Sequence, residues 1–95
     1  MYKNKITAVV GGSDSAAKDA LVLAEHAKKV FIVIRKENMT AEPVNVKRIA
    51  SKENIEIINN ANIVEIKGDS RLRKIVLDRE FNGKKELDVD GLLVD

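Results

Sequence analysis

The chain has 95 residues, of which 44% are hydrophobic and 34% charged, a balance that favours one globular domain over a disordered segment. Its 17 basic and 15 acidic residues are interspersed and only 3% are aromatic, so neither a nucleic-acid-binding patch nor a base-stacking surface is predicted. There is no cysteine, which excludes disulfides, cysteine zinc sites and cysteine nucleophiles within these residues. The apolar runs are short, so we expect no membrane segment and a cytoplasmic location.

Residues 5–58 show the apolar pattern of a strand–helix–strand–helix–strand unit. Short runs of consecutive β-branched and apolar residues predict buried strands, and the longer segments between them show helical spacing. We expect Lys28 and Lys29 in the last turn of the first helix, where positive charge suits the helix dipole. Strands are predicted over residues 6–10, 30–34 and 55–58, and helices over residues 15–28 and 41–52.

Small side chains on one face of the first predicted helix would let it lie close against a sheet. That inward face comprises Ala16, Ala20, Leu23, Ala24 and Ala27. The second helix, with Pro43 near its first turn, is expected to turn Val46, Ile49 and Ala50 inward. Continuous apolar strands separated by helices imply parallel pairing with right-handed crossovers.

Apolar residues alternate with polar ones after Asn59, which predicts an antiparallel three-stranded meander over residues 62–90. Asn82-Gly83 predicts a hairpin, because both central residues of a type I′ turn need positive φ, and Gly68-Asp69 is expected to turn the first strand pair. Residues 91–95 predict a return strand of the parallel sheet. The predicted fold class is therefore α/β: a Rossmann-like three-layer domain with a parallel sheet of about four strands, two helices and the meander.

The sequence Gly11-Gly12-Ser13-Asp14-Ser15-Ala16 joins the first predicted strand to the first helix. In this context a fingerprint of the form Gly-x-Gly-x-x-Gly/Ala binds a dinucleotide pyrophosphate at a helix N-terminus. Gly11 suits the tight turn and Ala16 suits close helix–strand contact, whereas Ser13 stands where a glycine normally lets the pyrophosphate approach. The hydroxyls of Ser13 and Ser15 could add hydrogen bonds. The alternative is that the glycines only turn the chain while Ser13 or Asp14 caps the helix.

Arg35 and Lys36 follow the second predicted strand, where NAD-binding half-folds usually carry an acidic residue for the ribose hydroxyls. Two cations at this position could hold a 2′-phosphate and so favour NADPH. The alternative is that both are ordinary solvated charges at a strand end. No catalytic or metal-binding role is predicted for the other candidates by residue type, which are His26, Asp88, Asp90 and Asp95.

Two stretches resemble the NADPH domain of bacterial and archaeal thioredoxin reductases: residues 8–16, Ala-Val-Val-Gly-Gly-Ser-Asp-Ser-Ala, and residues 23–30, Leu-Ala-Glu-His-Ala-Lys-Lys-Val. Arg35-Lys36 is similar to the basic pair that grips the 2′-phosphate in that family. Residues 41–43 resemble the start of its next helix, and residues 87–94 resemble its closing strand. The resemblance covers nearly the whole chain.

The resemblance implies that residues 1–95 are a single NAD(P)-binding domain, the central insert of a larger FAD-dependent enzyme. The parent would deliver hydride from NADPH, or from NADH, to an FAD bound mainly outside these residues, for disulfide reduction. Its redox-active Cys-x-x-Cys would lie upstream of a segment similar to residues 2–5. A thioredoxin-like protein and a second copy in a homodimer are the parent's expected partners.

Three departures from the family pattern bear on the cofactor. The family's second fingerprint glycine, its histidine before the basic pair and its arginine after that pair are Ser13, Ile34 and Thr40 here. Loss of a phosphate-contacting arginine predicts weaker NADPH preference or tolerance of NADH. Two alternatives stay open: a ferredoxin-NADP reductase-like or peroxiredoxin-reductase-like flavoprotein domain, and a non-catalytic module with a degenerate dinucleotide site.

Overall fold

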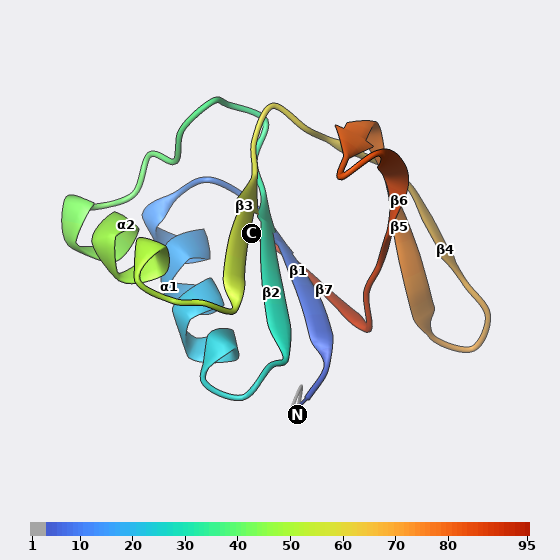
Figure 1. Cartoon of the computed structure of the whole chain (residues 1–95), viewed down its shortest axis with the longest axis horizontal. Helices are drawn as coiled ribbons and strands as arrows, with labels where there is room; N and C mark the ends of the chain where they lie inside the picture. Colours follow the sequence, from blue (N-terminus) through green and yellow to red (C-terminus); the bar gives the residue numbers. More distant parts are fainter. Residues whose placement is uncertain (1–3) are drawn as a thin grey trace.

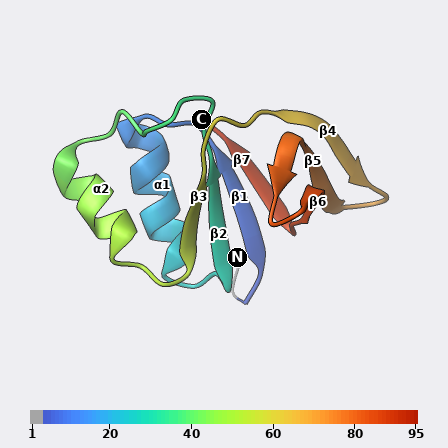
Figure 2. The same cartoon turned by 45° about the horizontal axis from the view of Figure 1, so that its top comes forward.

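Three layers make up the computed structural model, which describes residues 4–95 (Figure 1). Two helices cover one face of a parallel sheet, and an antiparallel sheet lies against the other (Figures 1 and 2). This arrangement confirms the predicted fold class. The elements in chain order are β1 (Ile6–Val10), α1 (Asp14–Ala24), β2 (Lys29–Val33), α2 (Pro43–Ala50), β3 (Ile55–Ile58), β4 (Ile63–Gly68), β5 (Leu72–Phe81), β6 (Lys84–Asp88) and β7 (Gly91–Val94).

The parallel sheet has the strand order β3-β2-β1-β7, and all its strand pairs are parallel. Its strands are mainly apolar and both of its faces are covered, as the sequence pattern indicated. The predicted return strand is present as β7, which pairs with β1 so that Leu92 lies opposite Ala8. All four strands therefore end at the same edge of the sheet, which is where ligands bind in open α/β sheets.

The first helix packs through small side chains, with Ala16, Ala17, Ala20 and Ala24 all buried against the sheet. It ends at Ala24, four residues earlier than predicted, so the expectation that Lys28 and Lys29 lie in its last turn is wrong. The reason is tertiary: the Lys28 amide donates to the carbonyl of Lys5 (2.9 Å), and Lys29 already pairs with Ile6 as the first residue of β2. Strand pairing therefore prevails over helix propensity here.

The second helix turns a different face inward than its apolar pattern predicted. Ile49 is buried, which confirms its predicted inward position. Asn45 is buried as well, whereas Val46 and Ala50 are exposed, so the expectation for Val46 and Ala50 is wrong. Asn45 takes the inward position because its side-chain amide donates to the carboxylate of Asp14 at the start of α1 (2.8 Å). A polar contact between the two helices thus sets the rotation of α2.

The antiparallel sheet has the order β4-β5-β6 and buries Ile75 and Leu77 against the parallel sheet. Asn82 and Gly83 have φ of 54° and 83°, which confirms the predicted turn with two positive φ values between β5 and β6. Val64 and Ile66 of β4 are 62% and 59% exposed. β4 is an edge strand, so only part of its apolar alternation reaches the core.

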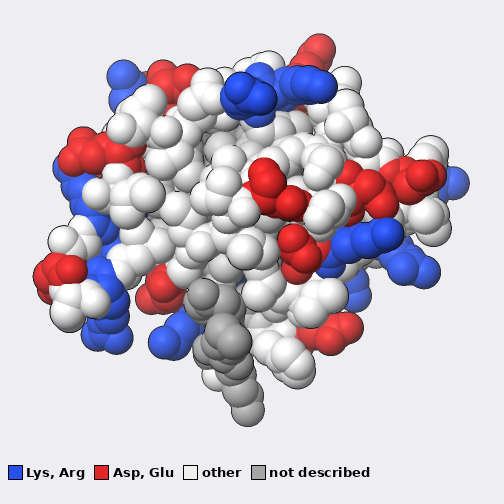
Figure 3. All heavy atoms as spheres, turned by 180° about the vertical axis from the view of Figure 1, so that it is seen from behind, with Lys and Arg blue, Asp and Glu red and all other residues white. Residues whose placement is uncertain are grey.

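Charges of both signs are interspersed over the face of the molecule that Figure 3 shows from behind. Across the antiparallel sheet, Glu86 pairs with Lys67 (2.8 Å) and Lys74 (3.5 Å). These contacts lower the pKa of Glu86, chiefly through the hydrogen bond from Lys67, and they raise the pKa of Lys67. Within residues 4–95, no helix is long and apolar enough to cross a membrane.

Candidate functional site

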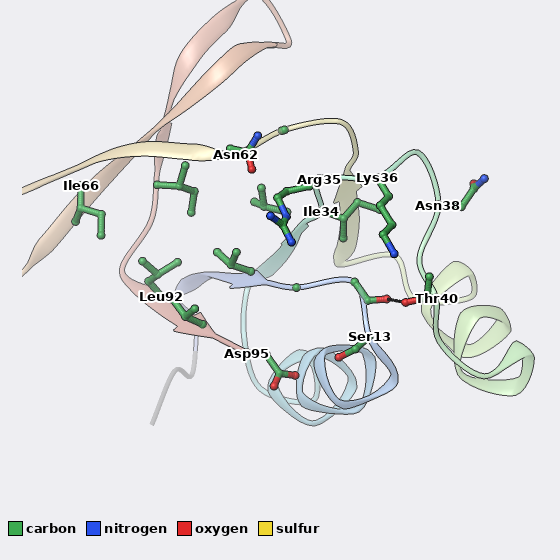
Figure 4. A pocket seen from close by; sticks show the side chains of 17 residues that line it. Ser13, Ile34, Arg35, Lys36, Asn38, Thr40, Asn62, Ile66, Leu92 and Asp95 are labelled. Carbon is green, nitrogen blue, oxygen red and sulfur yellow. Dashed lines mark hydrogen bonds between the residues drawn. The ribbon is translucent and has the colours of Figure 1, made fainter.

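A cavity of about 630 Å³ lies at the carboxyl edge of the parallel sheet (Figure 4). The residues that follow β1 and β2 form one part of its wall, and the end of β7 and the start of the meander form the rest. Its volume falls within the range of small-molecule sites. The lining includes Gly11, Gly12, Ser13, Arg35, Lys36, Thr40, Asn62, Ile66, Leu92 and Asp95.

The glycine turn after β1 depends on the absence of side chains. Gly11 has φ of +141°, a conformation that L-residues rarely adopt, and its amide donates to the carbonyl of Val33 (3.1 Å). A Cβ on Gly11 would lie 3.3 Å from the Cβ of Ala16, and one on Gly12 would lie 3.3 Å from Cγ2 of Ile34. The turn therefore holds the end of β1 against both α1 and β2, as predicted for Gly11 and Ala16.

Ser13 is the N-cap of α1. Its hydroxyl accepts a hydrogen bond from the amide of Ala16 (3.4 Å), and its carbonyl accepts one from the amide of Ala17 (3.1 Å). Ser13 also lines the cavity. The capping alternative that the sequence left open is thus observed, and it is compatible with an anion site because the first amides of a helix have no partner within it.

The carboxylate of Asp14 contacts α2, and Asp14 does not line the cavity. It accepts hydrogen bonds from the side-chain amide of Asn45 (2.8 Å) and from the backbone amide of Glu42 (2.9 Å), and it pairs with Lys18 at 3.3 Å. The hydrogen bond from Asn45, followed by that from Glu42, lowers the pKa of Asp14. Ser15 does not line the cavity either, so the structure brings only part of the predicted site residues together there.

Arg35 and Lys36 are exposed and line the cavity at the end of β2. Their side chains extend toward the turn that carries Ser13, whereas Asn38 points away (Figure 4). The carbonyl of Lys36 accepts a hydrogen bond from the amide of Asn60 (3.1 Å), which fixes the start of this loop. Neither side chain has an ion-pair partner among residues 4–95, so both charges are available to an anion in the cavity.

Sequence reasoning missed Asn62, which lines the cavity opposite the glycine turn. Its backbone amide and side-chain amide donate to the two carboxylate oxygens of Asp78, at 2.8 and 2.9 Å. Those hydrogen bonds, the side-chain one first, lower the pKa of Asp78. The two residues are sixteen positions apart in the chain, and no sequence motif marked the pair.

Four residues were given no functional role from the sequence, namely His26, Asp88, Asp90 and Asp95. His26 is exposed after α1, and Asp88 pairs with Lys74 (3.6 Å). Asp90 accepts a hydrogen bond from the amide of Ile6 (2.9 Å) at the opposite edge of the sheet from the cavity. Of these residues only Asp95 lines the cavity, beside Gly11.

The parallel sheet, the glycine turn and the cavity at its carboxyl edge define a Rossmann-like α/β domain. Residues 7–83 match the family described as pyridine nucleotide-disulphide oxidoreductase, and the chain belongs to that family.

Thioredoxin reductases are among its similar proteins. The thioredoxin reductase of Yarrowia lipolytica is 40% identical over 94 residues, which cover 97% of this chain and 30% of that protein. The solved structure of thioredoxin reductase from Giardia duodenalis has a TM-score of 0.89 and 33% identity, covering 98% of this chain and 31% of that one. A ferredoxin-flavin thioredoxin reductase from Clostridium acetobutylicum has a TM-score of 0.71 and 33% identity, covering 98% and 28%. The chain thus spans about 30% of the length of the curated relatives it matches.

Proposed function

We propose that the cavity binds a nicotinamide dinucleotide, with NADPH preferred over NADH. One observation carries the proposal: the basic pair after β2 and the glycine turn after β1 open onto the same cavity. In this arrangement the turn residues Gly11, Gly12 and Ser13 lie beside the pyrophosphate. The backbone at the start of α1, formed by Asp14, Ser15 and Ala16, supplies the positive end of the helix dipole.

Arg35 and Lys36 are assigned to the 2′-phosphate at the adenosine end of the dinucleotide. Their charges have no partner within residues 4–95, and they directly follow β2, the strand that pairs with β1, at the position where the adenosine ribose binds in domains of this type. A guanidinium and an ammonium offer charge-assisted hydrogen bonds to a phosphate and gain much less from a ribose hydroxyl. This difference is the physical basis of the proposed NADPH preference.

We further propose that residues 1–95 form one NAD(P)-binding domain of a thioredoxin-reductase-like flavoprotein, inserted centrally in its FAD-binding part. Names of the relatives and their greater length support this proposal. The nicotinamide supplies a hydride, and the residues described above bind and orient it toward an FAD held mainly by other residues of the parent. Disulfide reduction with a thioredoxin-like partner, a homodimeric parent and a cytoplasmic location belong to the same proposal.

A second candidate function is a non-catalytic module whose cavity no longer accepts a dinucleotide. Ser13 favours it, because its hydroxyl already caps α1 and it lines the cavity at the position where a fingerprint glycine normally lets the pyrophosphate approach. A third, a flavoprotein domain with a different electron partner, is favoured by the likeness to the protein described as a ferredoxin-flavin thioredoxin reductase. Binding of a dinucleotide by the chain would favour the dinucleotide-binding domain, and absence of binding would favour the non-catalytic module.

Calorimetric titration of the chain with NADPH and NADH in parallel tests the proposal. Saturable binding that favours NADPH is expected, and Arg35→Ala should weaken NADPH binding by about 1.5–3 kcal/mol, or roughly 10- to 150-fold, with a much smaller effect on NADH. Lys84→Ala is the matched control, because it removes a basic residue at the hairpin turn that does not line the cavity. Equal losses for both dinucleotides would contradict the 2′-phosphate assignment, and no binding at all would favour the non-catalytic module.

A further inference from the structure

Residues 35–42, which we call the basic loop, connect β2 to α2 and carry Arg35 and Lys36. The second half of the basic loop lies against the glycine turn. The amide of Thr40 donates to the carbonyl of Gly12 (2.7 Å), the hydroxyl of Thr40 donates to the same oxygen (3.2 Å), and Ser13 and Thr40 form a parallel bridge. The two chain segments that form the cavity wall are therefore joined directly to each other.

Asp14 fixes the far end of the basic loop. One oxygen of its carboxylate accepts both the backbone amide of Glu42, which is the N-cap residue of α2, and the side-chain amide of Asn45. We call these two hydrogen bonds the Asp14 clamp. Asn45 is only 6% exposed, and Glu42 makes no capping hydrogen bond with its own side chain. The carboxylate of Asp14 thus accepts the N-cap amide of α2 and one side-chain amide of its first turn.

The position of Asp14 also argues against direct contact with a phosphate. A carboxylate at the start of α1 would repel an anion in the cavity, but this one is directed at α2 and is occupied by two donors. Its hydrogen bonds reach across 28 and 31 residues of sequence to the segment that follows the basic pair. The basic loop is held at its start by the bond from Asn60 to Lys36 and at its end by the clamp.

We propose that Asp14 is a positioning residue for cofactor selectivity: through the clamp it holds the basic loop against the glycine turn, so that Arg35 and Lys36 face the 2′-phosphate. This inference rests on the proposed dinucleotide binding and names a role for Asp14 within it. Asp14 acts on the ligand only through the loop, and its own charge makes no contact with the dinucleotide.

Two substitutions separate the clamp from the charge. Asp14→Ala removes the acceptor and the charge together, whereas Asp14→Asn removes the charge but keeps an oxygen that can accept from Glu42 and Asn45. Lys18→Ala is the matched control, because it removes the exposed ion pair of Asp14 and leaves the clamp intact. Asn45→Asp replaces the donor by a carboxylate that repels Asp14, so it breaks the same contact from the α2 side. This variant serves as the second test if Asp14→Ala does not fold.

Hydrogen exchange at the amides of Thr40 and Glu42, measured without ligand, reports the clamp itself. Exchange should quicken about tenfold in Asp14→Ala and in Asn45→Asp, and should stay near that of the unmodified chain in Asp14→Asn and Lys18→Ala. Titration with NADPH and NADH then reports the selectivity. The NADPH-to-NADH affinity ratio should fall about tenfold in the first two variants and stay unchanged in the other two.

Unchanged exchange in Asp14→Ala would overturn the clamp, and an unchanged affinity ratio alongside faster exchange would overturn its role in selectivity. An affinity ratio that falls equally in Asp14→Asn would assign the effect to charge and would also overturn the inference. Failure of the unmodified chain to bind either dinucleotide would overturn the proposed function and, with it, the selectivity role. The exchange rates would then still decide whether the clamp exists.

Discussion

Replacing Ser13 with glycine separates its two contributions, the helix cap and the obstruction of the cavity. The capping hydrogen bond is long, at 3.4 Å, and Ser13 is exposed, so the cap belongs at the weak end of its range. Ser13→Ala should destabilise the fold by about 0.5–1 kcal/mol, whereas Ser13→Gly should destabilise it by only about 0.2–0.4 kcal/mol. For a domain of this size these losses correspond to melting-temperature decreases of about 2–8 °C and about 1–3 °C.

For dinucleotide binding, the larger effect should come from Ser13→Gly and not from Ser13→Ala. Ser13 lines the cavity where a fingerprint glycine normally stands, and glycine removes its Cβ, so Ser13→Gly should tighten dinucleotide binding about 3- to 10-fold, while Ser13→Ala keeps the Cβ and should give no gain. Thermal denaturation followed by circular dichroism gives the first quantity, and calorimetric titration gives the second. Unchanged or weaker binding by Ser13→Gly, or an equal gain by Ser13→Ala, would refute the view that the Cβ obstructs the pyrophosphate.

Two further predictions concern stability. Gly11→Ala should destabilise the fold by about 1–3 kcal/mol, because the backbone has φ of +141° and the new Cβ would lie 3.3 Å from that of Ala16; chemical denaturation would contradict this with a loss below about 0.5 kcal/mol. Asp78 has a pKa below its usual 3.8 because it accepts hydrogen bonds from Asn62, so its stabilising contribution is present above about pH 3.8 and is lost as pH falls through the lower folded-state pKa. The unmodified chain should therefore be more stable than Asp78→Asn near neutral pH, and the difference should shrink below pH 3.8; a pH-independent difference would contradict this account.

The strands and the general position of the site follow from local sequence patterns. The run Ile55–Ile58 is apolar except for Glu56, and it forms β3 with the predicted bounds. Asn82-Gly83 forms the predicted turn because its requirement for positive φ is local. Arg35 and Lys36 meet the glycine turn because parallel neighbouring strands end at one edge, a rule that needs only the order of elements.

What the sequence did not reveal depends on contacts between distant residues. The end of α1 is set by the hydrogen bond from the amide of Lys28 to the carbonyl of Lys5, which joins the chain just before β2 to the chain just before β1. No local sequence signal opposes a longer helix. The rotation of α2 is set by Asn45 and Asp14, so an apolar pattern that treats Asn45 as a surface residue selects the wrong face. The Asn62–Asp78 pair was missed for the same reason, since it forms only once β4 and β5 are paired.

The central claim is that the cavity at the carboxyl edge of the parallel sheet binds a dinucleotide. Titration of the isotope-labelled chain with NADPH, followed by amide chemical shifts in NMR spectra, tests it most directly. We expect saturable shifts at Gly11, Gly12 and Ser13, at the start of α1, and at Arg35 and Lys36. Shifts confined to the smaller cavity at the opposite edge, which Ile6, Arg73 and Asp90 line, or no saturable shifts at all, would contradict the claim.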